Sequence, residues 1–206
     1  GSFVVDGDRV TFTRDLQPDG TASKVTVDGK DVDAAELLPD DRGGPSFVRD
    51  GDLSFALVRR NGRLALRVRD NRSELRARFE GFPLYPYNPR LVVEARAIPA
   101  PAGELIDITN VTGFIERQPL AATISFELPG PSGPVSCSLV ATAGSGASLF
   151  VVFGDATNGC GTYAGGRFLS LDAPDPAGRV SLDFNLAHNP VCAFVPYATC
   201  PMPPST

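Results

Sequence analysis

The sequence predicts an all-β protein, and three observations support this fold class. Short runs of alternating or continuously apolar residues recur along the 206 residues, as in half-buried and fully buried strands. Gly, Pro, Asn and Asp separate these runs, and the chain contains 21 Gly and 19 Pro. Only DAAELL, residues 33–38, has the composition of a helical turn or two. We therefore expect roughly a dozen short strands joined by tight turns.

The clearest predicted element is a hairpin in DLSFALVRRNGRLALRVRD, residues 52–70. Asn61-Gly62 tolerates positive φ at both positions, as a two-residue type I′ turn requires. This turn pairs Arg60 with Arg63, Leu57 with Leu66, and Phe55 with Val68. The apolar side chains then share one face, so the turn and the hydrophobic pattern predict the same register.

Similar patterns predict the other strands in order. Hairpins are expected over Asp6-Gly7-Asp8 in FVVDGDRVTFT and over Asp28-Gly29 in VTVDGKDV. SELRARFE, residues 73–80, is expected to be a strand because Leu75, Ala77 and Phe79 alternate with polar residues. Further strands are expected at LVVEARAI, ATISFEL, VSCSLVA, SLFVVF, RFLSLD and RVSLDFN, which begin at residues 91, 122, 135, 148, 167 and 179.

A domain boundary is predicted at GFPLYPYNPR, residues 81–90, because its three prolines disfavour helix and central strand. Residues 1–80 would form a small β unit. GSFVVDGDRV enters a strand almost at once, so a unit truncated at its N-terminus is one interpretation. Residues 81–206 would form a second β domain, an antiparallel barrel or sandwich.

The first unit carries a local resemblance to a known fold. VDGKDV followed by DGDLSFALVRRNGRLALRVRD is similar to the closing strands of a forkhead-associated-type sandwich, where a short NG or DG hairpin precedes a GD strand. The strands and the Arg/Ser/His loop that bind phosphothreonine in that fold are not seen in this sequence. The resemblance therefore implies a small β-sandwich and carries over no phosphopeptide activity.

Composition and charge restrict the classes of binding partner that this protein is expected to have. The net charge of -5 argues against a nucleic-acid-binding protein. The eight arginines between Arg59 and Arg78 fit either a basic groove or a solvated strand face, and their alternation favours the strand face. No apolar stretch approaches the about 18 residues of a membrane helix, and no secretion signal is visible. We expect a cytoplasmic protein with no membrane partner and no cofactor; no pattern indicates its oligomeric state.

The most specific motifs lie in the second half. FGDATNGCGTYAGGRFLSLD begins at residue 153 and DFNLAHNPVCAFVPYATCPMPP begins at residue 183. Together with YPYNPRLVVEAR upstream, they resemble an uncharacterised bacterial family, domain of unknown function 1684, over most of the chain. The matching positions are Asp155, Thr157, Gly159, Thr162, Tyr163, Gly166, Arg167, Asp183, Asn185, Asn189, Pro190, Cys192, Cys200 and Pro201. The resemblance implies no established activity. The sequence departs from the family pattern at Cys160 and at His188. An aromatic residue is common at the position of His188, and this departure argues against His188 as an indispensable catalyst.

The glycine-rich connection of the first motif has the chemistry of a ligand site. Arg167 offers a planar fork for a carboxylate or phosphate, and hydroxyls and amides can orient the bound molecule. The candidate ligand-binding residues are Asp155, Thr157, Thr162, Tyr163, Arg167, Asn185 and Asn189. The alternative is a hydrogen-bonded turn in which Asp155 caps backbone amides and pairs with Arg167.

The second motif contains the candidates for catalysis. Asp183 could act as a general base, with Tyr163 or His188 as the acid and two asparagines as orienting groups. The alternative is that Asn189-Pro190 starts a turn and the amides satisfy backbone groups in a loop packed over the barrel.

The cysteines of the second motif are compatible with several roles. His188, Cys192 and Cys200 are borderline-to-soft metal ligands, but their spacing matches no standard zinc motif and a fourth ligand is missing, so no metal site is predicted. Cys192 and Cys200 could form a disulfide in an oxidising compartment, or both could be small buried hydrophobes. A Cys/His nucleophile pair lacks an orienting group in the sequence.

Three hypotheses for function follow. The leading one is a binding module that holds a small polar or anionic molecule in a pocket of the second domain. The second is an enzyme of unknown reaction type that uses Asp183. The third is a protein-interaction module without a pocket, in which both loops pack solidly and an apolar patch is exposed elsewhere.

Overall fold

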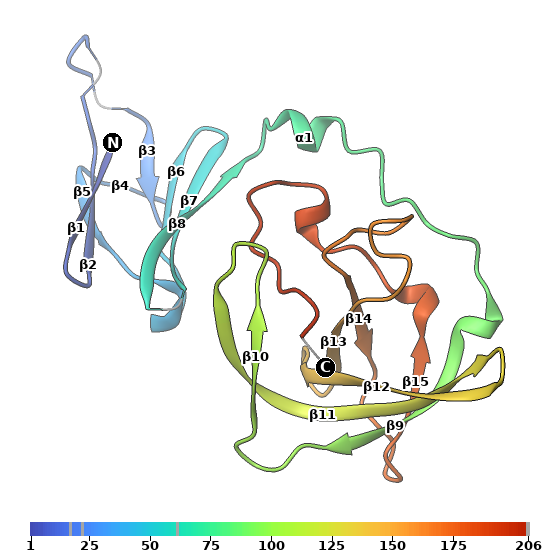
Figure 1. Ribbon diagram of the computed structural model, residues 1–206. Coiled ribbons are helices and arrows are strands. Elements are labelled where there is room, and N and C mark those ends of the chain that lie inside the picture. The colour runs from blue at the N-terminus through green and yellow to red at the C-terminus, as the bar shows by residue number, and fades with distance from the viewer. Residues whose placement is uncertain (17, 22, 61, 205–206) are drawn as a thin grey trace. The chain divides into compact units, whose positions relative to one another are not determined.

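The computed structural model describes residues 1–16, 18–21, 23–60 and 62–204. The all-β prediction is confirmed, because strands account for nearly all of the regular structure (Figure 1). The chain forms two compact units, Gly1–Glu80 and Gly81–Thr206. Among the described residues the longest helix has four residues, so no helix of this chain segment could cross a membrane.

The first unit contains two antiparallel sheets. One has the order β1-β2-β5, and the other has the order β4-β3-β6-β7-β8. The strands are β1 (Ser2–Asp6), β2 (Arg9–Thr13), β3 (Val25–Val27), β4 (Lys30–Asp31), β5 (Ala34–Leu37), β6 (Phe47–Asp50), β7 (Leu53–Arg60) and β8 (Arg63–Asp70). A 3₁₀ turn (Asp40–Arg42) and α1 (Glu74–Ala77) complete the unit. Phe12 and Leu37 of the first sheet pack in one buried cluster with Val48 and Leu57 of the second.

The three predicted hairpins form, and the hairpin of residues 52–70 has the predicted register. β7 and β8 pair Arg60 with Arg63, Leu57 with Leu66, and Phe55 with Val68. Gly62 has a φ of +74°, whereas Asn61 lies outside the described residues. Asp28 and Gly29 have φ values of +50° and +78°, the positive pair of a type I′ turn. Asp6 pairs with Arg9, so the first hairpin turns over two residues, of which Gly7 has a φ of +59°.

Two predictions in this unit are wrong. DAAELL contains β5, because Leu37 pairs with Val10 and both side chains are buried between the sheets. Cross-strand pairing and burial override the helical composition of this segment. SELRARFE contains α1 and no strand. Leu75 and Phe79, on the apolar face of the predicted strand, are 48% and 47% exposed, and the exposed turn is supported by a Glu74–Arg78 ion pair of 3.1 Å.

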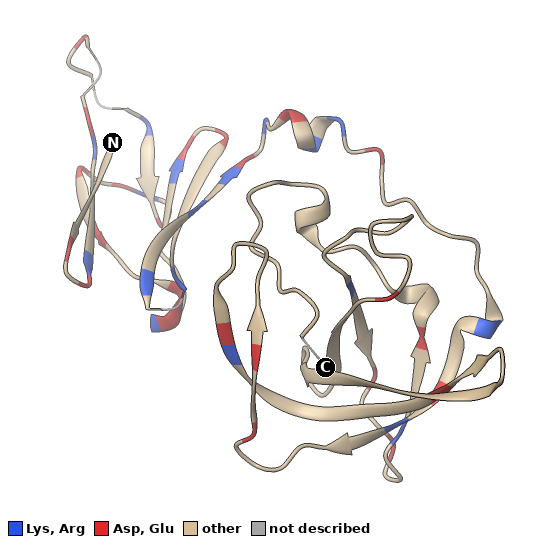
Figure 2. Ribbon diagram, in the orientation of Figure 1, with Lys and Arg blue, Asp and Glu red and all other residues tan. Residues whose placement is uncertain are grey.

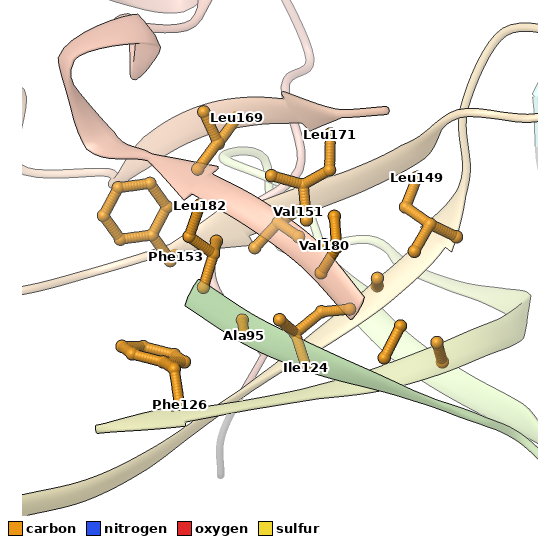
Figure 3. Close-up of a cluster of buried hydrophobic side chains, with 13 residues drawn as sticks. Ala95, Ile124, Phe126, Leu149, Val151, Phe153, Leu169, Leu171, Val180 and Leu182 are labelled. Carbon is orange, nitrogen blue, oxygen red and sulfur yellow. The ribbon is translucent and has the colours of Figure 1, made fainter. Parts of the chain in front are cut away.

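The second unit is one curled antiparallel sheet with the order β14-β13-β12-β11-β9-β15, and β10 also pairs with β11. The strands are β9 (Val92–Pro99), β10 (Leu105–Thr109), β11 (Ile115–Gly130), β12 (Gly133–Ala143), β13 (Leu149–Phe153), β14 (Arg167–Leu171) and β15 (Arg179–Asp183). The 3₁₀ turns are Pro89–Leu91, Phe184–Leu186 and Val191–Ala193. The sheet is a half-barrel whose inner face carries the apolar cluster of Figure 3, including Ile124, Val151, Leu169 and Leu182.

The chain after β15 adds to two edges of this sheet, first at β14 and then at β10. β14 and β15 lie at opposite ends of the strand order and do not pair. The backbone of His188 pairs with Phe168 of β14 through hydrogen bonds of 2.9 and 3.0 Å. Further along, Val111 donates to the carbonyl of Cys200 at 3.0 Å and Met202 donates to that of Thr109 at 2.8 Å. The red segment inside the outline of the curl in Figure 1 is therefore a structural part of the half-barrel.

Candidate functional site

Arg167 begins β14 and faces the inside of the half-barrel. It pairs directly with Phe153 of β13, so the two side chains stand on the same face of the sheet. Phe153 is a core residue, and the guanidinium lies 5.0 Å from the centre of its ring. The Arg167 side chain is 14% exposed and forms an ion pair with Asp155. Its Nε is buried and has no hydrogen-bond partner among the described residues.

Asp155 is the second charged group of this loop. Its Oδ1 accepts hydrogen bonds from the backbone amide of Thr157, at 2.9 Å, and from the Thr157 hydroxyl. Burial raises the pKa of Asp155, but the two Thr157 hydrogen bonds and the Arg167 charge together hold this pKa below its usual value. The carboxylate is therefore ionised at neutral pH, as the turn interpretation of this motif expects.

Asn158 organises the loop and was missed by the sequence analysis. Its Nδ2 donates to the carbonyl of Tyr163 at 2.8 Å and to the hydroxyl of Thr162 at 3.2 Å, and its Oδ1 accepts from the amide of Asp155. The hydroxyls of Thr157 and Thr162 lie 2.9 Å apart. The signal in the sequence was Asn158-Gly159, a turn pair in which an asparagine commonly bonds to nearby backbone.

Asn185 binds the backbone of a distant segment. Its Oδ1 accepts from the amide of Asn88 at 2.8 Å, and its Nδ2 donates to the Asn88 carbonyl at 3.0 Å. The Asn185 side chain thus makes with the Asn88 backbone the two hydrogen bonds that a residue of a neighbouring strand would make. The Tyr85 hydroxyl donates to the carbonyl of Gly161 at 2.7 Å, so the proline-rich segment lies against the glycine-rich loop. Sequence analysis expected Asn185 to contact a ligand and did not identify Tyr85.

The two family motifs meet inside this unit. Asn189 accepts a hydrogen bond of 3.4 Å from the backbone amide of Tyr163. A Cβ placed on Gly166 would lie 2.5 Å from Cγ of Pro203 and 2.8 Å from the carbonyl oxygen of Phe153. Only glycine fits there, and its φ is +91°. Pro203 of the last motif therefore packs on Gly154 and Gly166 of the first.

The three catalytic candidates make separate interactions. Asp183 accepts from the amide and the Nδ2 of Asn185, at 3.0 and 2.7 Å. The ring of the exposed His188 lies edge-on to Phe168, and its Nδ1 is 3.4 Å from the carbonyl oxygen of Leu186. A hydrogen bond with the Cys192 thiol, together with burial, raises the pKa of Tyr163. The hydrogen bonds among the described residues therefore do not link these three side chains to one another.

Cys192 and Cys200 lie together as free thiols. The amide of Cys192 donates to the sulfur of Cys200 at 3.3 Å. Burial, and then the hydrogen bond with Cys192, raise the pKa of Cys200 to about 11. The described residues include no group of three or more His, Cys, Asp or Glu side chains arranged to hold a metal ion.

A cavity lies elsewhere in this unit. It is an open depression of about 530 Å³ beside β10 and the first half of β11. Its lining residues are Gly103, Leu105, Ile106, Asp107, Arg117 and Pro204. None of these residues was a candidate from the sequence.

Comparisons with known proteins agree with the motif resemblance. Residues 77–206 match the family described as a protein of unknown function (DUF1684). Among solved structures, the chain is similar to an uncharacterized protein of Haloarcula marismortui determined by solution NMR, with 34% sequence identity and a TM-score of 0.50. That similarity covers 63% of this chain and 71% of the other. A comparison with curated proteins finds no match. By its family match over more than half of its length, the chain belongs to the DUF1684 family.

Proposed function

We propose that the C-terminal unit binds a small polar or anionic molecule at the loop between β13 and β14, with Arg167 as the anchoring residue. The observation that carries the proposal is the Arg167 side chain, which is 14% exposed and has a buried Nε without a hydrogen-bond partner. A buried unpaired donor costs about 1–3 kcal/mol. An oxyanion that accepts a hydrogen bond from this Nε would recover part of this cost.

The surroundings of Arg167 favour a ligand that both accepts and donates hydrogen bonds. Asp155 supplies an ionised carboxylate, and its side chain is 38% exposed. The hydroxyls of Thr157 and Thr162 are held in place by Asp155 and Asn158. Polar groups that are already ordered bind a ligand at lower entropic cost. A small carboxylate or phosphate with a hydroxyl or amine suits this set of groups.

The competing interpretation is that the Arg167–Asp155 pair only stabilises the loop. In that case no ligand is needed, because Asp155 already neutralises the guanidinium. The two interpretations differ in the effect of Asp155→Asn. A ligand anchored on Arg167 would bind this variant at least as tightly as wild type, since the competing carboxylate charge is removed.

The test is a thermal-shift screen of small carboxylates, phosphates and hydroxy acids on wild type, Asp155→Asn and Arg167→Ala. Arg179→Ala is the matched control, because Arg179 forms an exposed ion pair with Asp175 at 2.8 Å in the same unit. We expect at least one compound to stabilise wild type, Asp155→Asn and Arg179→Ala, and to leave Arg167→Ala unchanged. The proposal fails if no compound acts, or if an active compound stabilises Arg167→Ala equally.

A further inference from the structure

Two cysteines of the C-terminal segment are placed against one another. Cys192 lies in the 3₁₀ turn Val191–Ala193, and Cys200 lies where the chain joins the edge of β10. The amide of Cys192 is 3.3 Å from the sulfur of Cys200. The Cys192 side chain also contributes to the raised pKa of Cys200, as a neighbouring hydrogen-bonding group does. The sulfur of Cys200 therefore lies against Cys192, across the loop of residues 192–200.

Both ends of this loop are held by contacts that do not involve the sulfur atoms. The carbonyl of Cys200 accepts from Val111, and the next residue, Pro201, bridges to Asn110. At the other end, the amide of Ala193 donates to the carbonyl of the fully buried Pro190 at 2.9 Å. Because the backbone already holds the two residues close, a covalent bond between the sulfurs requires little movement of the chain.

We propose that Cys192 and Cys200 are a reversible thiol–disulfide modification site, which a low-molecular-weight disulfide such as oxidised glutathione converts to an intramolecular disulfide. The bond would close the loop of residues 192–200 beneath Tyr163, whose phenol interacts with Cys192. The modification uses no contact to a ligand at Arg167, so it stands or fails independently of the proposed binding function.

The reaction follows ordinary thiol–disulfide exchange. The half-buried Cys192 is the more accessible of the two, so its thiolate attacks one sulfur of oxidised glutathione and releases one glutathione thiolate. The Cys200 thiolate then attacks the Cys192 sulfur and releases the second glutathione. The two cysteines lose two electrons and two protons, and the glutathione disulfide is reduced. The thiolate of Cys200 is scarce because burial raises its pKa, but its position against Cys192 makes the second step intramolecular.

The sequence allows a direct test, because trypsin separates the four cysteines into two pairs. Cys137 and Cys160 fall in the peptide 118–167, and Cys192 and Cys200 fall in the peptide 180–206. The purified protein is treated with oxidised glutathione, alkylated, digested and analysed by mass spectrometry. We expect peptide 180–206 to lose two hydrogen atoms and to become resistant to alkylation. Chymotrypsin, which cleaves after Phe194 and Tyr197, should leave its two halves linked until a thiol reductant is added.

Two variants make the test decisive. In Cys200→Ser, Cys192 has no partner and should retain glutathione as a mixed disulfide. Cys160→Ser removes the exposed cysteine and should leave the internal bond of peptide 180–206 unchanged. The proposal is overturned if wild-type peptide 180–206 remains fully alkylated, if it retains glutathione on Cys192, or if Cys192 links instead to Cys160 or to a second chain.

Discussion

The two units are both built from antiparallel strands, but they hold their turns and loops with different chemistry. In the N-terminal unit, buried arginines contact several partners each. Arg14 is 6% exposed, donates to the carbonyl of Val25 at 3.0 Å and pairs with Asp31. Arg59 pairs with Asp8 at 3.1 Å and with Asp41 at 3.0 Å. Arg14 follows β2 of one sheet and contacts β3 and β4 of the other, whereas Arg59 of β7 contacts the β1–β2 turn and the 3₁₀ turn.

The C-terminal unit uses neutral amides for the same purpose. In its described part, the ion pairs are Arg117–Asp107, Arg167–Asp155 and Arg179–Asp175. Its long connections are held instead by Asn158, Asn185 and Asn189. Figure 2 shows the same contrast, because charged residues are dense along the strands of the first unit and sparse in the second.

This difference accompanies a difference in the exposure of the bonding groups. In the N-terminal unit, the carboxylate that pairs with Arg14 remains largely in water, since the Asp31 side chain is 77% exposed. Asn158, Asn185 and Asn189 of the C-terminal unit are half-buried, and a bonded amide costs far less to bury than an unpaired charge. Arg167 is the exception in that unit, which is why we place the candidate site there.

The largest expected effect tests the contact between the two family motifs. Gly166→Ala should lower the free energy of unfolding by about 2–4 kcal/mol, because the new methyl group would overlap Pro203 and the positive φ is strained for alanine. Gly146→Ala is the matched control, since Gly146 has a φ of +64° with no atom within 4 Å of the added carbon. Urea unfolding of both variants measures the difference. Equal losses would show that Pro203 does not pack on Gly166.

The next effect tests the arginine contacts of the N-terminal unit. Arg14→Leu should cost about 1–3 kcal/mol, because the carbonyl of Val25 loses its donor and the partner carboxylates lose their cation. Arg9→Leu is the control, because Arg9 is 66% exposed and its ion pair among the described residues is with Glu36, at 3.4 Å. The control should change stability by less than about 1 kcal/mol. A larger loss of stability in Arg9→Leu than in Arg14→Leu would contradict the expectation that the more buried arginine contributes more to stability.

Asn185→Ala tests the amide contacts of the C-terminal unit. The variant should cost about 1–2 kcal/mol, because it removes the hydrogen bonds to the amide and carbonyl of Asn88. Hydrogen exchange at the Asn88 amide should accelerate, whereas the core amides of β13 should be unchanged. Asn71→Ala is the control, since Asn71 is exposed and its side chain accepts only from Arg76. Unchanged exchange at Asn88 would argue against this anchoring role.

The smallest effect concerns acid stability. The pKa of Asp155 is lowered in the folded protein, so its contribution to stability is present above the unfolded pKa and is lost as the pH falls through the folded value. Asp155→Asn should therefore destabilise the protein at pH 7 and have a smaller effect near pH 3. Urea unfolding at both pH values measures this change, which partial exposure of the carboxylate keeps small. The reverse pH trend would mean that Asp155 does not accept from Thr157 and Arg167.

Some residues make interactions in the structure that their sequence context does not indicate. His188 attracted attention for its side chain, yet its backbone closes the sheet against Phe168. Asn185 was expected to contact a ligand, whereas it binds the backbone of Asn88. Tyr85 bonds to Gly161, 76 positions away in the sequence. These roles depend on partners that only the curled sheet brings within reach.

What the sequence by itself determined is the local structure of segments whose partners are close along the chain. The hairpin of β7 and β8 is the clearest case, because neighbouring residues supply both the turn and the paired faces. Tertiary structure alone decided that DAAELL is a strand, that SELRARFE is not, and that the glycine and proline motifs interlock at Gly166. The reason is that turn preferences act over a few bonds, whereas burial and long-range hydrogen bonds have no value until distant segments are folded together.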